Sequence, residues 1–217
     1  MRPRRLSGTE ALGAVAVVAT GAAVALEYAH VWRRGSAALP SEADAPPDVL
    51  VAGAEAARET VEVAVEGYRA GSARENALLN LLMSYSATFA VVRLGTHLIR
   101  DYGSFGPFRN VRVGRRHIHH FVPGIALSML SGGTSILWRD QSLDPWLALP
   151  FGIGAALTLD EAAMLLEHED VYWTERGIVS VQITFGAMAL LGAAAIALRV
   201  LRRGEREVLG LDVGSAP

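Results

Sequence analysis

Five long apolar blocks dominate this sequence and limit the folds open to it. They cover residues 10–31, 77–99, 119–138, 146–167 and 178–200. A helix needs about 20 mostly apolar residues to cross a bilayer, and each block has about that length. A soluble α/β protein would break such runs with turns and alternating polar residues. We therefore predict an all-α fold, a polytopic membrane bundle of about five transmembrane helices.

The composition agrees with a membrane protein and excludes several kinds of site. The four tryptophans stand near predicted helix ends, where aromatic residues gather at membrane interfaces; they are Trp32, Trp138, Trp146 and Trp173. Cysteine is absent, which excludes disulfides, cysteine-ligated zinc and thiol nucleophiles. The formal net charge of −2 gives no indication of a nucleic-acid partner, and we find no nucleotide or haem motif. Every basic residue is arginine, which indicates a GC-rich, bacterial genome.

The chain divides into a first transmembrane helix with a basic N-terminus, a linker with an acidic amphipathic helix, a four-helix transmembrane core and a disordered tail. These segments cover residues 1–32, 33–76, 77–203 and 204–217. The basic start also resembles a signal peptide, but we expect the helix to be retained. The acidic helix, about 48–70, begins at Asp48, ends at Gly71 and is too polar to span. The arginines of the short loop 100–118 favour a cytoplasmic N-terminus in the cell membrane.

Helix alternation brings most of the histidines and many acids to one membrane face. The second block ends, the third begins, the fourth ends and the fifth begins on that face, whichever helices pair. Five of the six histidines fall there, and His30 falls on the other face. The residues gathered are Arg93, His97, Arg100, Asp101, His117, His119, His120, Asp160, Glu161, Glu167, His168, Glu169 and Asp170.

Two adjacent acids lie several residues inside the fourth apolar block. Asp160 and Glu161 are some six residues from its end, which is about 9–10 Å at the rise of a helix. A charge at the centre of a spanning helix costs roughly 2.5–3.5 kcal/mol, and less near the interface. Such groups normally face the bundle interior and pair with another group. Arg93 lies at a comparable depth on the second block, so we expect a structural ion pair with it.

The histidine and acidic residue types are suited to a metal site. Imidazole nitrogen and carboxylate oxygen suit Zn, Fe or Mn. If the HIHH stretch is helical, His117 and His120 share a face; if it is extended, His117 and His119 do. The candidate metal ligands are His97, His117, His120, Asp160, Glu161 and Glu167. Asp160 and Glu161 are also the candidate catalytic residues, with a carboxylate as general base.

Two other interpretations of the same residues remain open. In the first, they form an interfacial polar network, with Arg93 paired to an acid and the histidines at lipid headgroups. In the second, they line a proton or ion pathway, for which intramembrane histidines and acids are typical.

Two segments resemble a group of uncharacterised actinobacterial integral membrane proteins. The segments are HIHHFVPGI at 117–125 and GIGAALTLDEAAMLLEHEDVYWTERGIVSVQ at 152–182. Proteins of that group pair an HxHH segment with an LTLDE…EDVYW segment. The resemblance covers the third to fifth blocks and not the first 75 residues. In the group, the position of Glu167 can hold histidine and that of His168 an apolar residue, which implies that Glu167 is the better ligand candidate. The resemblance implies a membrane fold and no particular reaction.

The sequence favours a membrane-embedded, metal-dependent enzyme, a hydrolase or an oxidoreductase, that acts on a lipid or other apolar substrate. The alternatives are an ion or proton transporter or channel component, and a non-catalytic membrane scaffold. The expected partners are the lipid bilayer and a lipid substrate, and no nucleic acid.

Overall fold

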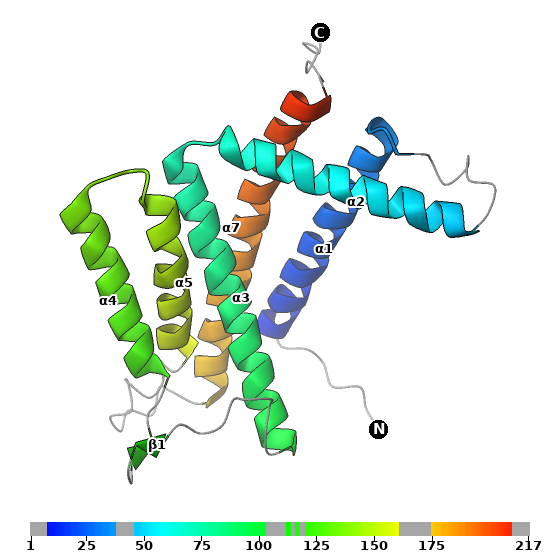
Figure 1. The fold of residues 1–217 in the computed structure, drawn as a ribbon. Helices are drawn as coiled ribbons and strands as arrows, with labels where there is room; N and C mark the ends of the chain where they lie inside the picture. The colour runs from blue at the N-terminus through cyan, green and yellow to red at the C-terminus, as the bar shows by residue number, and fades with distance from the viewer. Residues whose placement is uncertain are drawn as a thin grey trace, which may run out of the picture.

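A computed structural model describes the backbone of residues 8–37, 46–102, 112–113, 116–117, 120–160 and 175–209, and the side chains of 11, 13–37, 48–95, 120–160 and 185–209. The described helices are α1 (Gly8–Arg34), α2 (Pro46–Arg69), α3 (Ala73–Tyr102), α4 (Phe121–Trp138), α5 (Asp144–Asp160) and α7 (Glu175–Leu209). Five of them stand side by side, and α2 lies across the upper ends of α1 and α7 (Figure 1). The predicted all-helical membrane bundle is confirmed.

Length and composition allow four of the described helices to cross a membrane. The candidate spans are Gly13–Arg34, Ala73–Gly95, Phe121–Trp138 and Phe185–Leu209. Large apolar side chains such as Val18 and Leu137 are 69% and 81% exposed on these helices, as lipid-facing residues are. The fifth upright helix, α5, is described over 17 residues and packs against both α3 and α4. It therefore occupies the same layer as the four spans.

The helix ends gather on two faces, as helix alternation predicts. The lower face in Figure 1 carries the starts of α1, α4 and α7 and the ends of α3 and α5. The upper face carries α2, the start of α3, the α4–α5 turn and the end of α7. Residues that are far apart in the sequence are thus brought to each face.

Helix α2 agrees closely with the acidic helix predicted at 48–70. It begins at Pro46, two residues before the predicted cap Asp48, and ends at Arg69, just before Gly71. Its inner face places Ala52, Ala56 and Val63 in the core.

Glycines allow α2 to touch α7 backbone to backbone. A Cβ on Gly67 would lie 1.8 Å from the carbonyl oxygen of Val200, and one on Gly204 would lie 1.7 Å from that of Val63. No side chain fits at either position, so the crossing point of α2 and α7 is fixed.

The α3–α4–α5 layer is packed in the same manner. A Cβ on Gly154 would lie 2.5 Å from the carbonyl oxygen of Gly124, and one on Gly152 would lie 2.4 Å from that of Leu81. Small residues thus allow α5 to approach α4 on one side and α3 on the other, as at many membrane helix interfaces.

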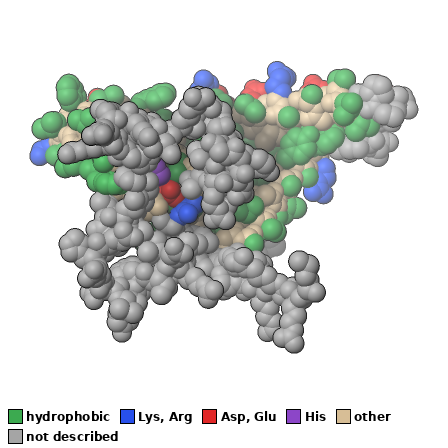
Figure 2. Space-filling view, turned by 90° about the horizontal axis from the view of Figure 1, so that it is seen from below, with side chains coloured by type: hydrophobic (Ala, Val, Ile, Leu, Met, Phe, Trp, Pro, Cys, Tyr) green, Lys and Arg blue, Asp and Glu red, His purple; other side chains and the backbone are tan. Residues whose placement is uncertain are grey.

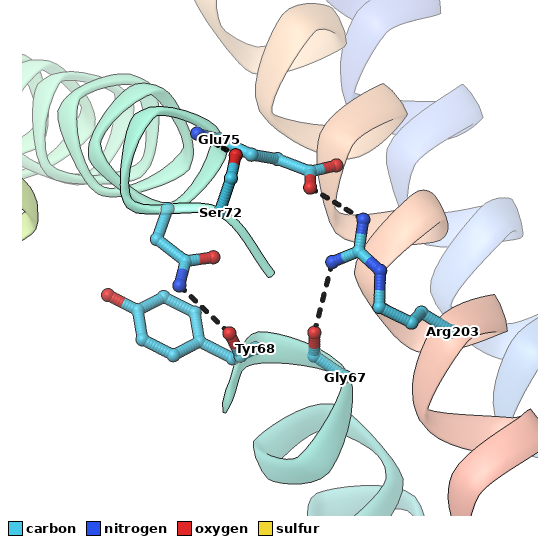
Figure 3. A network of polar contacts seen from close by, with 6 residues as sticks. Gly67, Tyr68, Ser72, Glu75 and Arg203 are labelled. Carbon is cyan, nitrogen blue, oxygen red and sulfur yellow. Dashed lines mark hydrogen bonds and ion pairs between the residues drawn. The ribbon is translucent and has the colours of Figure 1, made fainter. Parts of the chain in front are cut away.

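The tail predicted to be disordered over 204–217 is partly helical, so that prediction is wrong for residues 204–209. Helix α7 continues to Leu209, and Gly204 and Glu205 are buried. Arg203 explains part of this, because it donates to the carbonyl of Gly67 at 3.2 Å and pairs with Glu75 at 2.6 Å (Figure 3). These contacts hold the end of α7 against α2 and α3.

The loop between α3 and α4 contains a short ladder that the sequence did not indicate. β1 (Arg112–Val113) and β2 (Arg116–His117) pair antiparallel, with Arg112 opposite His117. Helix α4 begins only at Phe121. His117 therefore lies on a strand and not on a backward extension of α4, as the alternative with an extended stretch predicts for this residue.

Candidate functional site

Asp160 lies between a basic residue on α3 and a histidine just before α4. Arg93 Nε on α3 is 2.7 Å from Asp160 Oδ1 at the end of α5. His120 Nε2, just before α4, is 3.3 Å from Asp160 Oδ2. The side chain of Asp160 is 7% exposed, whereas those of Arg93 and His120 are 29% and 33% exposed. We call these three residues the Asp160 cluster.

Arg93 is the partner expected for Asp160 from its depth, and an aromatic stripe on α3 holds it in place. Tyr85, Phe89 and Arg93 follow one another at four-residue spacing, so they share one helix face. The rings of Tyr85 and Phe89 stack with centroids 6.2 Å apart, and the guanidinium carbon of Arg93 is 5.6 Å from the centroid of Phe89. Tyr85 packs with Ala156 of α5 and Ala189 of α7 in the core. The arginine is thus anchored to the centre of the bundle.

His120 is positioned by the start of α4. Its carbonyl accepts a hydrogen bond from the backbone N–H of Gly124 at 3.1 Å. This bond ties His120 to the first turn of the helix. Pro123 sits within that turn, where its missing N–H removes no helical hydrogen bond. Figure 2 views the molecule from this end and shows histidine, acidic and basic side chains in a row.

The remaining predicted ligands have side chains outside the described residues. His97 lies on α3 one turn after Arg93, and His117 lies on β2. Of both, the structure describes the backbone alone. Four further residues lie outside the described part of the chain: His119, Glu161, Glu167 and His168. Their roles stay predictions.

The geometry gives Asp160 and His120 different chemical roles. Arg93 and His120 each contact one oxygen of Asp160, so Arg93 holds the carboxyl group in place and the carboxyl group in turn orients the imidazole. A histidine that binds a metal through one ring nitrogen usually donates a hydrogen bond from the other, often to a carboxylate as here. Because the contact uses Nε2, His120 would bind a metal through Nδ1. Asp160 would then position the imidazole, since a metal beside it would face the Arg93 charge.

The described side chains do not complete a metal site by themselves. Among the side chains that the structure describes, no three histidines or acids are grouped as metal ligands would be. A site at His120 therefore needs donors from His97, His117, Glu161 or Glu167.

A second polar cluster lies at the upper end of the bundle, and the sequence analysis missed it. Glu27 of α1 and Glu205 of α7 contact each other through their carboxyl groups and are 9% and 7% exposed. His30 Nε2 is 3.4 Å from Glu205 Oε1. Two carboxylates in contact repel unless they share a proton. Glu205 lies in the segment predicted to be disordered, so the sequence places only His30 on this face.

Comparisons with known proteins give no indication of the function. No protein-family model, curated protein or solved structure matches the chain.

Proposed function

We propose that this chain is a membrane-embedded, metal-dependent enzyme that acts on a lipid or other apolar substrate at the Asp160 cluster. The carrying observation is the buried Asp160 carboxylate held between Arg93 and His120 from three separate segments. Buried ionisable groups inside a membrane are costly, and they are commonly kept for function.

In this proposal each residue of the cluster has one task. Arg93 neutralises Asp160, and Asp160 orients the imidazole of His120. His120 binds a divalent transition metal such as Zn, Fe or Mn, with further donors from His97, His117, Glu161 or Glu167. A metal held by these residues would supply the activation of water or oxygen.

The metal content of purified protein tests this proposal. After a chelator wash, we expect one or two metal ions per chain in the native protein and in the control His30→Ala, whose histidine lies at the other end. His120→Ala should retain at least tenfold less metal at unchanged helicity. Metal-free native protein with full helicity would overturn the proposal. Incubation with a lipid extract, followed by mass spectrometry, then identifies the product that depends on metal.

A second candidate function is proton or ion transport. It is favoured by the two buried clusters of acids and histidines at opposite ends of the bundle, around Asp160 and around Glu205. In proteoliposomes, transport predicts a proton or ion flux that both Asp160→Asn and Glu27→Gln reduce. Absence of flux in the native protein excludes this function.

A further inference from the structure

An open cleft of about 350 Å³ lies between α3, α4 and α5 near their upper ends. Apolar side chains of Leu81, Leu147 and Phe151 form its walls, and the small residues Ser131 and Gly132 of α4 leave the space. This volume is at the low end of the range of roughly 300–1,000 Å³ for small-molecule pockets. The Asp160 cluster lies at the other end of the same helices, so the cleft is a separate site.

Two opposite charges stand at the mouth of the cleft. Arg74 lies in the first turn of α3 and is exposed, and it has no hydrogen bond or ion pair with the residues that the structure describes. Asp144 begins α5 and accepts a hydrogen bond from Ser135 Oγ at 3.0 Å. Leu81 lies seven residues deeper than Arg74, about 10 Å along a helix. The cleft is therefore charged at the membrane interface and apolar toward the membrane interior.

We propose that this cleft binds a phospholipid with a phosphoethanolamine headgroup. Arg74 pairs with its phosphate, Asp144 accepts hydrogen bonds from its ammonium group, and part of one acyl chain lies between Leu81 and Phe151. A headgroup that is only anionic would face the Asp144 carboxylate without a compensating cation. A choline headgroup has a cation but no N–H to donate to Asp144.

The test measures lipid retention by delipidated, purified protein. Equal mole fractions of phosphatidylethanolamine, phosphatidylglycerol and phosphatidylcholine are added, and bound lipid is counted by native mass spectrometry. We expect one phosphatidylethanolamine per chain, retained at least tenfold over the other two lipids. The same lipid should raise the thermal midpoint.

Three variants separate the cleft from general lipid binding. Arg74→Gln and Asp144→Asn should each lower the retention of phosphatidylethanolamine at least fivefold, and Ala77→Phe should do so by filling the cleft. Arg206→Gln, an exposed arginine on the same face, is the control and should leave retention unchanged. Equal retention of all three lipids, or full retention by both Arg74→Gln and Ala77→Phe, would overturn the proposal. Metal content reports on the other site and should not change.

Discussion

Arg93 is the residue on which the described part of the candidate site depends most. It lies against Asp160 on one side and Phe89 on the other. Removing one partner of a buried ion pair leaves the other charge uncompensated, which costs more than the pair contributes. Replacing both partners by apolar residues removes that penalty.

We therefore expect Arg93→Leu to lower the free energy of unfolding by about 2–4 kcal/mol, because the buried Asp160 carboxyl group loses its ion-pair partner. The double variant Arg93→Leu with Asp160→Leu should recover most of this loss. Thermal midpoints in one detergent measure both effects. If the double variant recovers stability but binds no metal, the cluster is functional. If the double variant retains both metal and activity, the Asp160 cluster has only a structural role.

Asp140 gives a pH dependence that can be measured outside the membrane. The backbone N–H of Ser142 donates to its carboxylate at 2.9 Å, and this bond and one from the Ser142 hydroxyl lower the pKa of Asp140 below 3.8. A lowered folded-state pKa stabilises the fold above the ordinary pKa and ceases to do so as pH falls through the folded-state value. The α4–α5 turn is thus more stable near neutral pH than in acid.

Asp140→Asn should lower the thermal midpoint slightly at pH 7, and the difference from the native protein should shrink as pH falls below 3.8, because the carboxylate becomes protonated. Midpoints measured across this range test it. A difference that stays constant with pH would show that the charge of Asp140 has no part in the effect.

The glycine crossings determine how whole helices are placed. Helix α2 lies on α7 at Gly67 and Gly204, where carbonyl oxygens occupy the space of any side chain. A substitution there must move the backbone, and overpacking typically costs about 1–3 kcal/mol.

Gly67→Ala should accordingly reduce stability by at least this amount and shift α2 away from α7. Gly133→Ala is the matched control, because a Cβ at Gly133 meets nothing within 4 Å. It should be neutral or stabilise by about 0.5–1 kcal/mol, since glycine is unfavourable within a helix. Equal midpoints for the two variants would argue against the tight crossing.

For the whole molecule, the arrangement predicts which segments share a side of the membrane. The native chain lacks cysteine, so single cysteines can be labelled without background. Ala70→Cys and Gln141→Cys should react together with an impermeant maleimide, and Val113→Cys should react only from the other side. With a cytoplasmic N-terminus, the first two react in intact cells. Labelling of all three from one side would refute the bundle topology.

Part of the fold and of the candidate site could be predicted from the sequence. The length of each apolar block predicts a span, and the alternating direction of successive spans predicts the membrane face on which each helix end lies. The contact of Arg93 with Asp160 could be anticipated from matched depth. The contact of Glu27 with Glu205 could not, because it depends on which helices pair and how each is rotated. Composition also misled at residues 204–209, where Arg203 and the Gly67–Gly204 contact extend a polar segment as helix.

The packing of α1 and α2 against α7 affects the order in which the chain can assemble. Helix α5 packs against both α3 and α4, and the three are consecutive in the sequence, so they can associate as soon as α5 enters the membrane. Helices α1 and α2 precede them but have their main partner in α7, which is synthesised after α5. Until then Glu27 lacks Glu205, and Gly67 lacks its counterpart. Helices α1 and α2 can therefore complete their packing only after α7 has been synthesised, and a chain truncated before α7 would leave their packing faces uncovered.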